Sequence, residues 1–179
     1  MNYANIKPLD VANGSGIRVS LFVSGCRNHC EDCFNPESWD FHYGTIFDAA
    51  AEERILQSLR PDYVRGLTLL GGEPLEPENQ PALYALLQKV RREYPQKDIW
   101  CYTGFVYEAL PRSRAVESGI LEELLSLIDV LVEGPFVREL KDLSLRFRGS
   151  KNQRILDLPA SRKAGMAVLW TDEYGGQSK

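Results

Sequence analysis

Strand-like and helix-like segments alternate along most of the 179-residue chain, and this alternation constrains the fold more than any other feature. Apolar, β-branched or aromatic segments with strand character lie at 18–24, 66–70, 98–104, 129–134 and 165–170. Segments with apolar residues at helical spacing lie at 45–59, 78–94 and 119–128. Because strands separated by helices form βαβ units, we expect an α/β fold with a mainly parallel sheet.

The helix expected at 45–59 has a recognisable start. Thr45 and Asp48 have the spacing of a capping box, which satisfies free N–H groups in the first turn of a helix. One helical face then carries Phe47, Ala51, Ile55 and Leu59. The sequence therefore predicts a helix that begins near Thr45 and buries this face.

Unusual sequences follow three of the expected strands. They are SGC at 24–26, GGEP at 71–74 and YTGF at 102–105. Ligands of parallel sheets gather beyond the carboxyl ends of the strands, where such segments meet. The sequence therefore predicts one site built from three strand ends.

The first of these sequences opens a cluster of cysteines. Cys26, Cys30 and Cys33 are three of the four cysteines in the chain. Thiolates are soft ligands that suit zinc, copper(I) and iron–sulfur clusters. A structural zinc site or an iron–sulfur cubane normally takes four protein ligands. The trio therefore indicates either a cluster with one open metal position, where a substrate or cofactor binds, or a structural zinc knuckle completed elsewhere.

The other candidates for a fourth ligand have simpler interpretations. Cys101 lies in an apolar strand between two aromatic residues, where we expect a buried small hydrophobe. His29 is adjacent to Cys30, so reaching the same metal would strain the loop. We expect His29 and His42 to be surface residues.

The second strand-end sequence is a candidate binding turn. Gly71 and Gly72 allow a ligand to approach the backbone closely. Glu73 adds a carboxylate that can bind an ammonium group, and Pro74 ends the strand. Alone, such a sequence is usually only a turn, but its place one strand after the cysteine loop makes it a candidate site.

Length and composition indicate one ordinary globular domain. Hydrophobic residues make up 44% of the chain and charged residues 26%. We expect a single domain over 1–179, with a core at about 10–170 and a flexible tail at about 171–179. No apolar run is long enough to span a bilayer, and residues 1–10 have no signal-peptide core. We therefore expect a cytoplasmic protein with reduced thiols and no membrane partner. The net charge of −4 argues against nucleic acid as a partner.

The CxxxCxxC loop after one strand and the GGE turn after the next together resemble the radical S-adenosylmethionine superfamily. In that family three cysteines hold a 4Fe–4S cluster, whose open iron binds the amino and carboxylate groups of S-adenosylmethionine. The resemblance assigns the cluster ligands to Cys26, Cys30 and Cys33 and the methionine contacts to Gly71, Gly72 and Glu73. It also implies the family's fold, an incomplete (partial) β/α barrel with mainly parallel strands.

The resemblance implies further cofactor contacts. The residue before the third cysteine lies near adenine in the family and is often aromatic, but here it is Asp32, with Phe34 on the other side of that cysteine. Both are candidates for contact with the adenine. Thr103 falls where ribose or methionine-carboxylate contacts are found in the family.

Longer stretches are similar to the activating proteins of anaerobic (class III) ribonucleoside-triphosphate reductases, a subgroup of that superfamily. They lie at 10–26, 33–35, 71–75, 98–104, 129–136 and 145–154. The NGxGxR lead-in and the FRGSxNQR segment separate this subgroup from the activating enzyme of pyruvate formate-lyase.

The similarity implies a function as a glycyl-radical activase. Such an enzyme reductively cleaves S-adenosylmethionine to a 5′-deoxyadenosyl radical, which abstracts an α-hydrogen from a glycine of the reductase. The implied partners are the large subunit of the reductase and a reduced electron donor such as flavodoxin. The alternatives are an activase of another glycyl-radical enzyme and a non-catalytic zinc or iron–sulfur protein.

Two charged features have less specific interpretations. Arg146, Arg148 and Arg154 form a basic segment, for which we expect a solvated face, with partner docking as the alternative. Glu133 ends a strand at the predicted site and either contacts the ligand or caps a turn.

Overall fold

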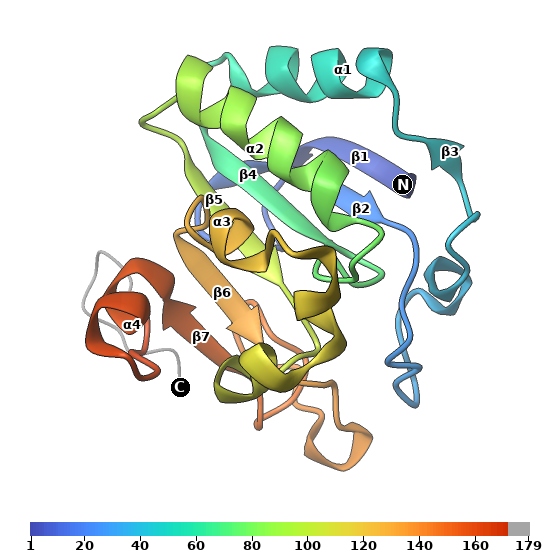
Figure 1. Ribbon diagram of the computed structural model, residues 1–179, viewed down its shortest axis with the longest axis vertical. Helices are drawn as coiled ribbons and strands as arrows, with labels where there is room; N and C mark the ends of the chain where they lie inside the picture. Colours follow the sequence, from blue (N-terminus) through green and yellow to red (C-terminus); the bar gives the residue numbers. More distant parts are fainter. Residues whose placement is uncertain (172–179) are drawn as a thin grey trace.

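The computed structural model describes residues 1–171, which contain a seven-stranded mixed sheet. The strands are β1 (Asn2–Asp10), β2 (Ile17–Val23), β3 (Thr45–Ile46), β4 (Val64–Gly71), β5 (Asp98–Tyr102), β6 (Val130–Glu133) and β7 (Arg154–Asp157). Their order across the sheet is β3-β1-β2-β4-β5-β6-β7 (Figure 1). The tail predicted at 171–179 lies outside the described residues, apart from Thr171.

The centre of the sheet is parallel and its edges are antiparallel. Strands β2, β4, β5 and β6 pair with one another in parallel. Strands β1, β3 and β7 join by antiparallel pairing. The predicted α/β fold is thus confirmed, whereas the parallel arrangement holds only for the four central strands. Within the described residues the sheet remains open and does not close into a barrel.

The helices connect the central strands. They are α1 (Ala49–Leu59), α2 (Gln80–Glu93), α3 (Leu121–Leu125) and α4 (Leu158–Ala164), with the 3₁₀ segments η1 (Pro36–Trp39), η2 (Tyr107–Arg112), η3 (Arg114–Ser118) and η4 (Arg138–Leu140). Helices α1, α2 and α3 precede β4, β5 and β6, and they lie on the same face of the sheet (Figure 1). The predicted helices at 78–94 and 119–128 correspond to α2 and to the shorter α3.

The two faces of the sheet differ in what covers them. Alternate residues of a strand point to opposite faces. The main core, which the helices cover, takes Leu21, Leu69, Cys101 and Leu131 from neighbouring strands. The intervening positions Phe22, Leu70 and Tyr102 therefore belong to the other face, which these three helices leave uncovered.

Helix α1 begins four residues later than predicted. Thr45 and Ile46 form strand β3 by pairing with the start of β1, so their backbone groups are already committed. Asp48 is the N-cap itself, and its carboxylate accepts a hydrogen bond of 2.9 Å from the backbone N–H of Ala51. Ala51, Ile55 and Leu59 form the buried face as predicted, whereas Phe47 precedes the helix and packs against the core only in part.

The prediction of a strand at 165–170 is wrong. Gly165 ends α4 in the left-handed conformation (φ 67°), and the following residues meet the sheet only through an isolated bridge between Leu169 and Leu156. The last strand is instead β7, which the sequence did not reveal. At this bridge the N–H of Trp170 donates to Ile155 O at 2.9 Å, and the Trp170 ring meets that of Trp100 edge-on at 4.9 Å.

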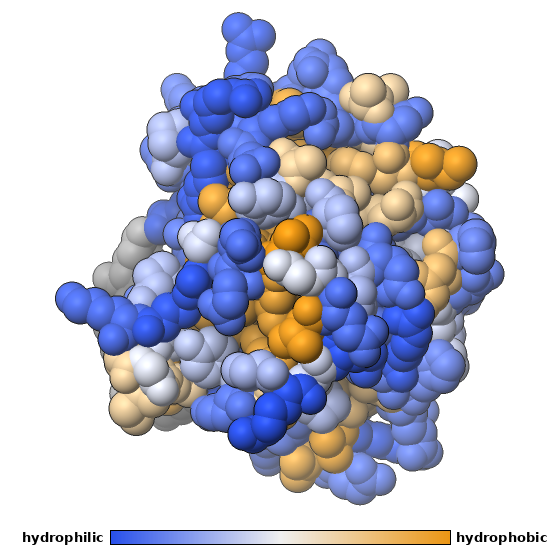
Figure 2. All heavy atoms as spheres, viewed as in Figure 1, coloured by the Kyte–Doolittle hydropathy of each residue, from blue (hydrophilic) through white to orange (hydrophobic). Residues whose placement is uncertain are grey.

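The face of the molecule that carries helices α1 to α3 is mainly polar. Figure 2 shows hydrophilic residues over most of one face, with apolar residues gathered in a smaller area near its centre. None of the helices within residues 1–171 combines the length and apolar character that crossing a membrane requires.

Candidate functional site

A cavity of about 500 Å³ lies beyond the carboxyl ends of β2, β4 and β5. Phe22, Leu70 and Tyr102 line it, which places it on the sheet face opposite α1 to α3. The predicted site residues that also line it are Cys26, Cys30, Cys33, Phe34, Gly71, Gly72, Glu73 and Thr103. The three strand ends therefore meet at one cavity, as the alternation of strands and helices predicts.

Backbone hydrogen bonds join the first two strand ends. The N–H of Gly72 donates to Val23 O at 2.8 Å, and the N–H of Glu73 donates to Gly25 O at 2.9 Å. A Cβ atom on Gly72 would lie 2.7 Å from Gly25 O, which is too close for any side chain. Glycine at position 72 thus permits the contact between the GGE turn and the cysteine loop.

The cysteine loop is closed at its base. The N–H of Gly25 donates to Ser38 O at 2.8 Å, and the N–H of Cys26 donates to Trp39 O at 3.2 Å. The exposed His29 stacks on Trp39, with ring centroids 4.5 Å apart. Residues 24–39 therefore form a loop after β2 whose two ends are joined by backbone hydrogen bonds.

The three thiols share the cavity without converging on one point. Cys26 is buried, and Cys30 and Cys33 are half-buried. Within residues 1–171 no group of three or more His, Cys, Asp or Glu side chains is arranged to hold a metal ion. Burial raises the pKa of the Cys26 thiol to about 12 and also raises that of Cys30. A bound cation would reverse this preference for the neutral thiol.

Cys101 does not face the cavity. It is fully buried in the core beneath the helices, as predicted. The chain thus brings three cysteines to the cavity and places its fourth on the other face of the sheet. This donor set fits a group that needs three thiolates and takes its remaining ligand from elsewhere.

Glu73 is a buried carboxylate at the cavity wall, with 1% of its surface exposed. It accepts hydrogen bonds from the backbone N–H of Leu75 (2.9 Å) and of Gly104 (2.7 Å). The hydroxyl of Thr103 (2.8 Å) and the amide Nδ2 of Asn28 (3.0 Å) also donate to it. Burial nevertheless raises the pKa of Glu73 to about 7.

Thr103 acts on Glu73 within the protein. Its Oγ1 donates to Glu73 and accepts a hydrogen bond of 3.1 Å from the backbone N–H of Phe105. Thr103, at the end of β5, therefore holds in place the carboxylate of Glu73, which follows β4. A contact between Thr103 and a cofactor stays a prediction.

The two residues proposed for adenine contact occupy different places. Phe34 lines the cavity with 73% of its surface exposed, and its ring meets that of Phe136 at 6.3 Å. Asp32 is exposed and pairs with Arg138 at 3.2 Å rather than lining the cavity. For both residues, adenine contact stays a prediction.

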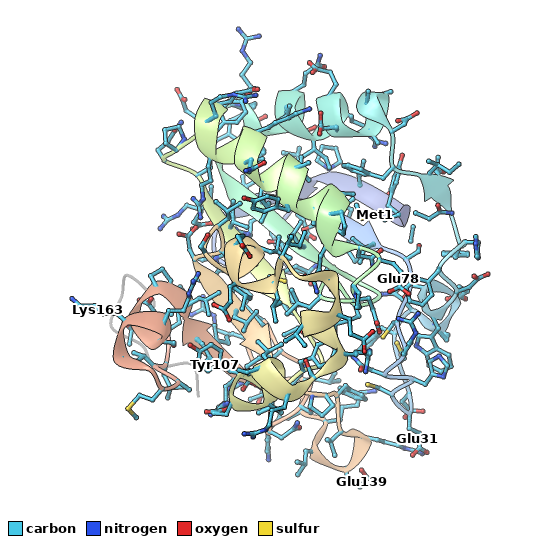
Figure 3. All side chains as sticks on the ribbon, viewed as in Figure 1. Met1, Glu31, Glu78, Tyr107, Glu139 and Lys163 are labelled. Atoms are coloured by element: carbon cyan, nitrogen blue, oxygen red, sulfur yellow. The ribbon has the colours of Figure 1, made fainter. Side chains whose placement is uncertain are left out.

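The far wall of the cavity comes from residues 134–153. Gln153 organises this segment, since its Oε1 accepts hydrogen bonds from the N–H groups of Gly149 and Ser150 and its Nε2 donates to Gly134 O. An ion pair between Arg138 and Glu31 joins the segment to the cysteine loop. Figure 3 shows the two regions at the same end of the molecule, where Glu31 and Glu139 are labelled.

Two arginines of the basic segment are less solvated than expected, whereas Arg146 is exposed as predicted. Arg148 lines the cavity and donates to Gln153 O at 2.9 Å. Arg154 pairs with Glu133 and Glu108. Glu133 is almost fully buried and accepts from the N–H of Tyr107 at 2.9 Å, so it caps η2, the second of its two predicted roles.

Sequence reasoning missed three polar residues around the cysteine loop. Asn28 bridges Glu73 and Arg114, and Arg114 pairs with the buried Glu76. Their contacts join positions 38 to 86 residues apart. Charged residues at such separations form no local pattern, so the sequence carried no signal for them.

Comparison with known proteins agrees with this geometry. Residues 12–156 match the model of a family described as a 4Fe-4S single cluster domain. The anaerobic ribonucleoside-triphosphate reductase-activating protein of Haemophilus influenzae is 43% identical over 157 residues, which cover 87% of this chain and 97% of that protein. The protein of the same name from Escherichia coli K12 is 41% identical, over 86% of this chain and 96% of its own length.

A viral relative extends the comparison. The anaerobic ribonucleoside-triphosphate reductase-activating protein of Enterobacteria phage T4 is 37% identical over 155 residues, covering 87% of this chain and 93% of its own length. The matches include the cysteine loop, the GGE turn and most of the far wall of the cavity. The chain therefore belongs to the 4Fe-4S single cluster domain family and to the family of anaerobic ribonucleoside-triphosphate reductase-activating proteins.

Proposed function

We propose that this chain is a radical S-adenosylmethionine enzyme that installs a glycyl radical in anaerobic ribonucleoside-triphosphate reductase. One observation carries the proposal: Cys26, Cys30 and Cys33 line the same cavity as Glu73, while Cys101 lies on the opposite face of the sheet. Three thiolates suit a 4Fe–4S cluster with one open iron. The names of the relatives supply the reductase as the target.

Each part of the cavity has a role in this proposal. Cys26, Cys30 and Cys33 bind three irons, after a local closure of the loop that brings their sulfur atoms together. When bound, the cluster supplies the electron that cleaves the S–C5′ bond of S-adenosylmethionine, and the 5′-deoxyadenosyl radical takes an α-hydrogen from the partner's glycine. A donor such as flavodoxin returns the electron.

Glu73 is suited to bind the amino group of methionine. A neighbouring ammonium favours the charged carboxylate and so lowers its pKa, which burial holds at about 7 without the ligand. Thr103, Gly104 and Asn28 hold the carboxylate in place. A bound ammonium group would therefore stabilise the ionised form of Glu73, which burial disfavours.

The sheet also fits the proposed role. Helices α1 to α3 cover one face of the open sheet, and the cavity occupies the other, which supports our proposal of an incomplete β/α barrel. An open side gives a loop of a large protein partner access to the cofactor. We place this chemistry in the cytoplasm, where thiols stay reduced.

Anaerobic reconstitution tests the proposal. The chain is loaded with iron and sulfide, reduced with dithionite and mixed with S-adenosylmethionine. We expect about four irons per chain and the formation of 5′-deoxyadenosine and methionine. A chain that retains zinc, assembles no cluster and leaves S-adenosylmethionine intact would instead be a structural zinc protein.

A further inference from the structure

An ion-pair network around one buried carboxylate holds the first half of the cysteine loop. At its centre is Glu76, which follows the GGE turn and is fully buried. Its carboxylate accepts from Arg114 Nε (2.9 Å) and Nη2 (2.7 Å). A buried carboxylate needs such partners to remain charged, because desolvation disfavours the ion.

The same carboxylate holds the cysteine loop directly. The backbone N–H of Arg27 donates to Glu76 Oε1 at 2.9 Å, and the Arg27 guanidinium donates to Oε2 at 2.7 Å. Arg27 also pairs with Glu78 on the surface, which Figure 3 labels. Both the main chain and the side chain of Arg27, which follows Cys26, are therefore hydrogen-bonded to the segment after β4.

Arg114 connects this network to Glu73. Its Nη2 donates to Asn28 Oδ1 at 2.8 Å, which leaves Asn28 Nδ2 to donate to Glu73 at 3.0 Å. The Arg114 guanidinium also lies over the ring of Phe105, 4.6 Å from its centroid. One arginine thus sets the orientation of the amide that lies between the loop and the proposed methionine site.

The second half of the loop has weaker attachments. Glu31 and Asp32, which flank Cys33 on its N-terminal side, pair with Arg138. All three side chains are about half or more exposed, and exposed ion pairs contribute little to stability. The Cys26 side of the loop is therefore anchored to one buried carboxylate, whereas both members of each ion pair on the Cys30–Cys33 side are exposed.

We propose that Glu76 and Arg114 are positioning residues that hold the Cys26 side of the loop in its binding conformation before any cofactor arrives. The part of this proposal that concerns the cluster rests on the proposed function, whereas the anchoring of the loop does not. Cluster assembly then needs only the outer half of the loop to move, with Cys30 and Cys33 closing onto a fixed Cys26. Neither residue contacts the reacting atoms.

Hydrogen exchange in the cofactor-free chain tests the anchoring. Glu76→Gln removes the charge that Arg27 and Arg114 share and keeps the shape of the side chain. We expect amide exchange at Arg27 and Asn28 to become about 10- to 100-fold faster, the effect of losing hydrogen bonds to a charged acceptor. Glu122→Gln is the matched control, because Glu122 is exposed and pairs only at the surface with Arg162. Unchanged exchange in Glu76→Gln would overturn the proposal.

Arg114→Lys tests the link to Asn28. Lysine keeps a charge beside Glu76 but lacks the planar fork that reaches Glu76 and Asn28 together. We expect the reconstituted variant to lose iron to a chelator at least about tenfold faster than the wild type, with Glu122→Gln behaving as wild type. If Arg114→Lys retains iron as well as the wild type does, the positioning role is contradicted. This test remains available if the Glu76→Gln variant does not fold. The exchange experiment uses no cofactor, so it stays decisive if the wild type fails to cleave S-adenosylmethionine.

Discussion

At the scale of single residues, Glu73 is the most unusual group in the cavity. It is almost fully buried, yet the donors around it are hydroxyl, amide and backbone groups rather than cations. Four hydrogen bonds offset part of the cost of burying the charge, and the pKa of about 7 shows that they do not offset all of it. A cationic ligand would favour the charged carboxylate, which is the role proposed for the amino group of methionine.

This environment predicts a pH dependence of stability in the cofactor-free chain. Between the unfolded pKa of 4.5 and the folded pKa of about 7, the folded state holds a proton on Glu73 that the unfolded state has released. The free energy of unfolding should therefore fall as the pH rises through this window, by up to about 1.4 kcal/mol per pH unit, and then level off.

Urea unfolding at pH 5, 6, 7 and 8 measures this slope. Carboxyls whose pKa is lowered, such as Glu76 and Glu78, change the free energy of unfolding at a lower pH than this window. Glu73→Gln should abolish the fall between pH 5 and 7. An equal slope in that variant would assign the effect to another group.

The cysteines offer a comparison within one residue type. Cys30→Ala should reduce the iron content from about four per chain to nearly none, because two thiolates do not hold a cubane. Cys101→Ala should keep the cluster and cost about 1 kcal/mol of stability, since it only trims the core. Iron analysis and denaturant unfolding of both variants check this, and loss of the cluster in Cys101→Ala alone would refute the ligand assignment.

At the scale of elements, the close contact of two turns builds the site. The GGE turn after β4 and the SGC turn after β2 hydrogen-bond to each other because parallel neighbours end at the same edge of the sheet. Gly72 has no room for a Cβ against Gly25 O and Ser38 O. The cysteine loop can therefore reach the cavity only if position 72 is glycine.

Gly72→Ala tests this contact. The added methyl must displace backbone atoms, so we expect a loss of about 1–3 kcal/mol in the free energy of unfolding and a lower cluster content after reconstitution. Gly119→Ala is the control, because its Cβ would meet no atom within 4 Å although its φ is +75°. That variant should lose some stability from backbone strain and keep its cluster, whereas equal cluster loss in both would remove the steric explanation.

Loss of the contact between the cysteine loop and residues 134–153 should change local flexibility rather than overall stability. Arg138→Ala removes the exposed pairs to Glu31 and Asp32, so the melting temperature should hardly change. Proteolysis of the cofactor-free chain within the cysteine loop should become faster, because these pairs tether its outer half. An unchanged cleavage rate would mean that other contacts, such as those of the Phe34 ring with Phe136 and Lys141, hold the two segments together.

The sequence predicted the elements that carry a strong local pattern. The central strands and α2 have apolar periods that match their burial, and the cysteine spacing and GGE turn lie at strand ends that topology brings together. The edge strands were not predicted, because they form by pairing with distant strands and have no strong local pattern. β1 contains Lys7 and Pro8 and is only partly buried, and residues 165–170 pack Trp170 on Trp100 rather than forming a strand.

The same distinction applies to the site. Cys26 and Glu73 are recognisable because their chemistry is concentrated in short motifs. Asn28, Glu76 and Arg114 acquire a role only through contacts made in the folded chain. Residues that position a site are thus harder to predict than residues that bind.

At the scale of the whole molecule, the two faces of the sheet have separate tasks. The face under α1 to α3 contains the main apolar core, which also encloses Cys101. The other face supports the cavity, whose walls are the cysteine loop and residues 134–153. A smaller apolar cluster of Trp100, Val130, Val132 and Ile155 also packs on this second face, so the cavity lies beside buried apolar residues.

The most direct test of the account follows a hydrogen atom from partner to product. The anaerobic ribonucleoside-triphosphate reductase is produced with glycine deuterated at its α-carbon and mixed anaerobically with the reconstituted chain, dithionite and S-adenosylmethionine. We expect a glycyl radical on the reductase by electron paramagnetic resonance and one deuterium in the 5′-deoxyadenosine. Unlabelled 5′-deoxyadenosine with no glycyl radical would contradict it.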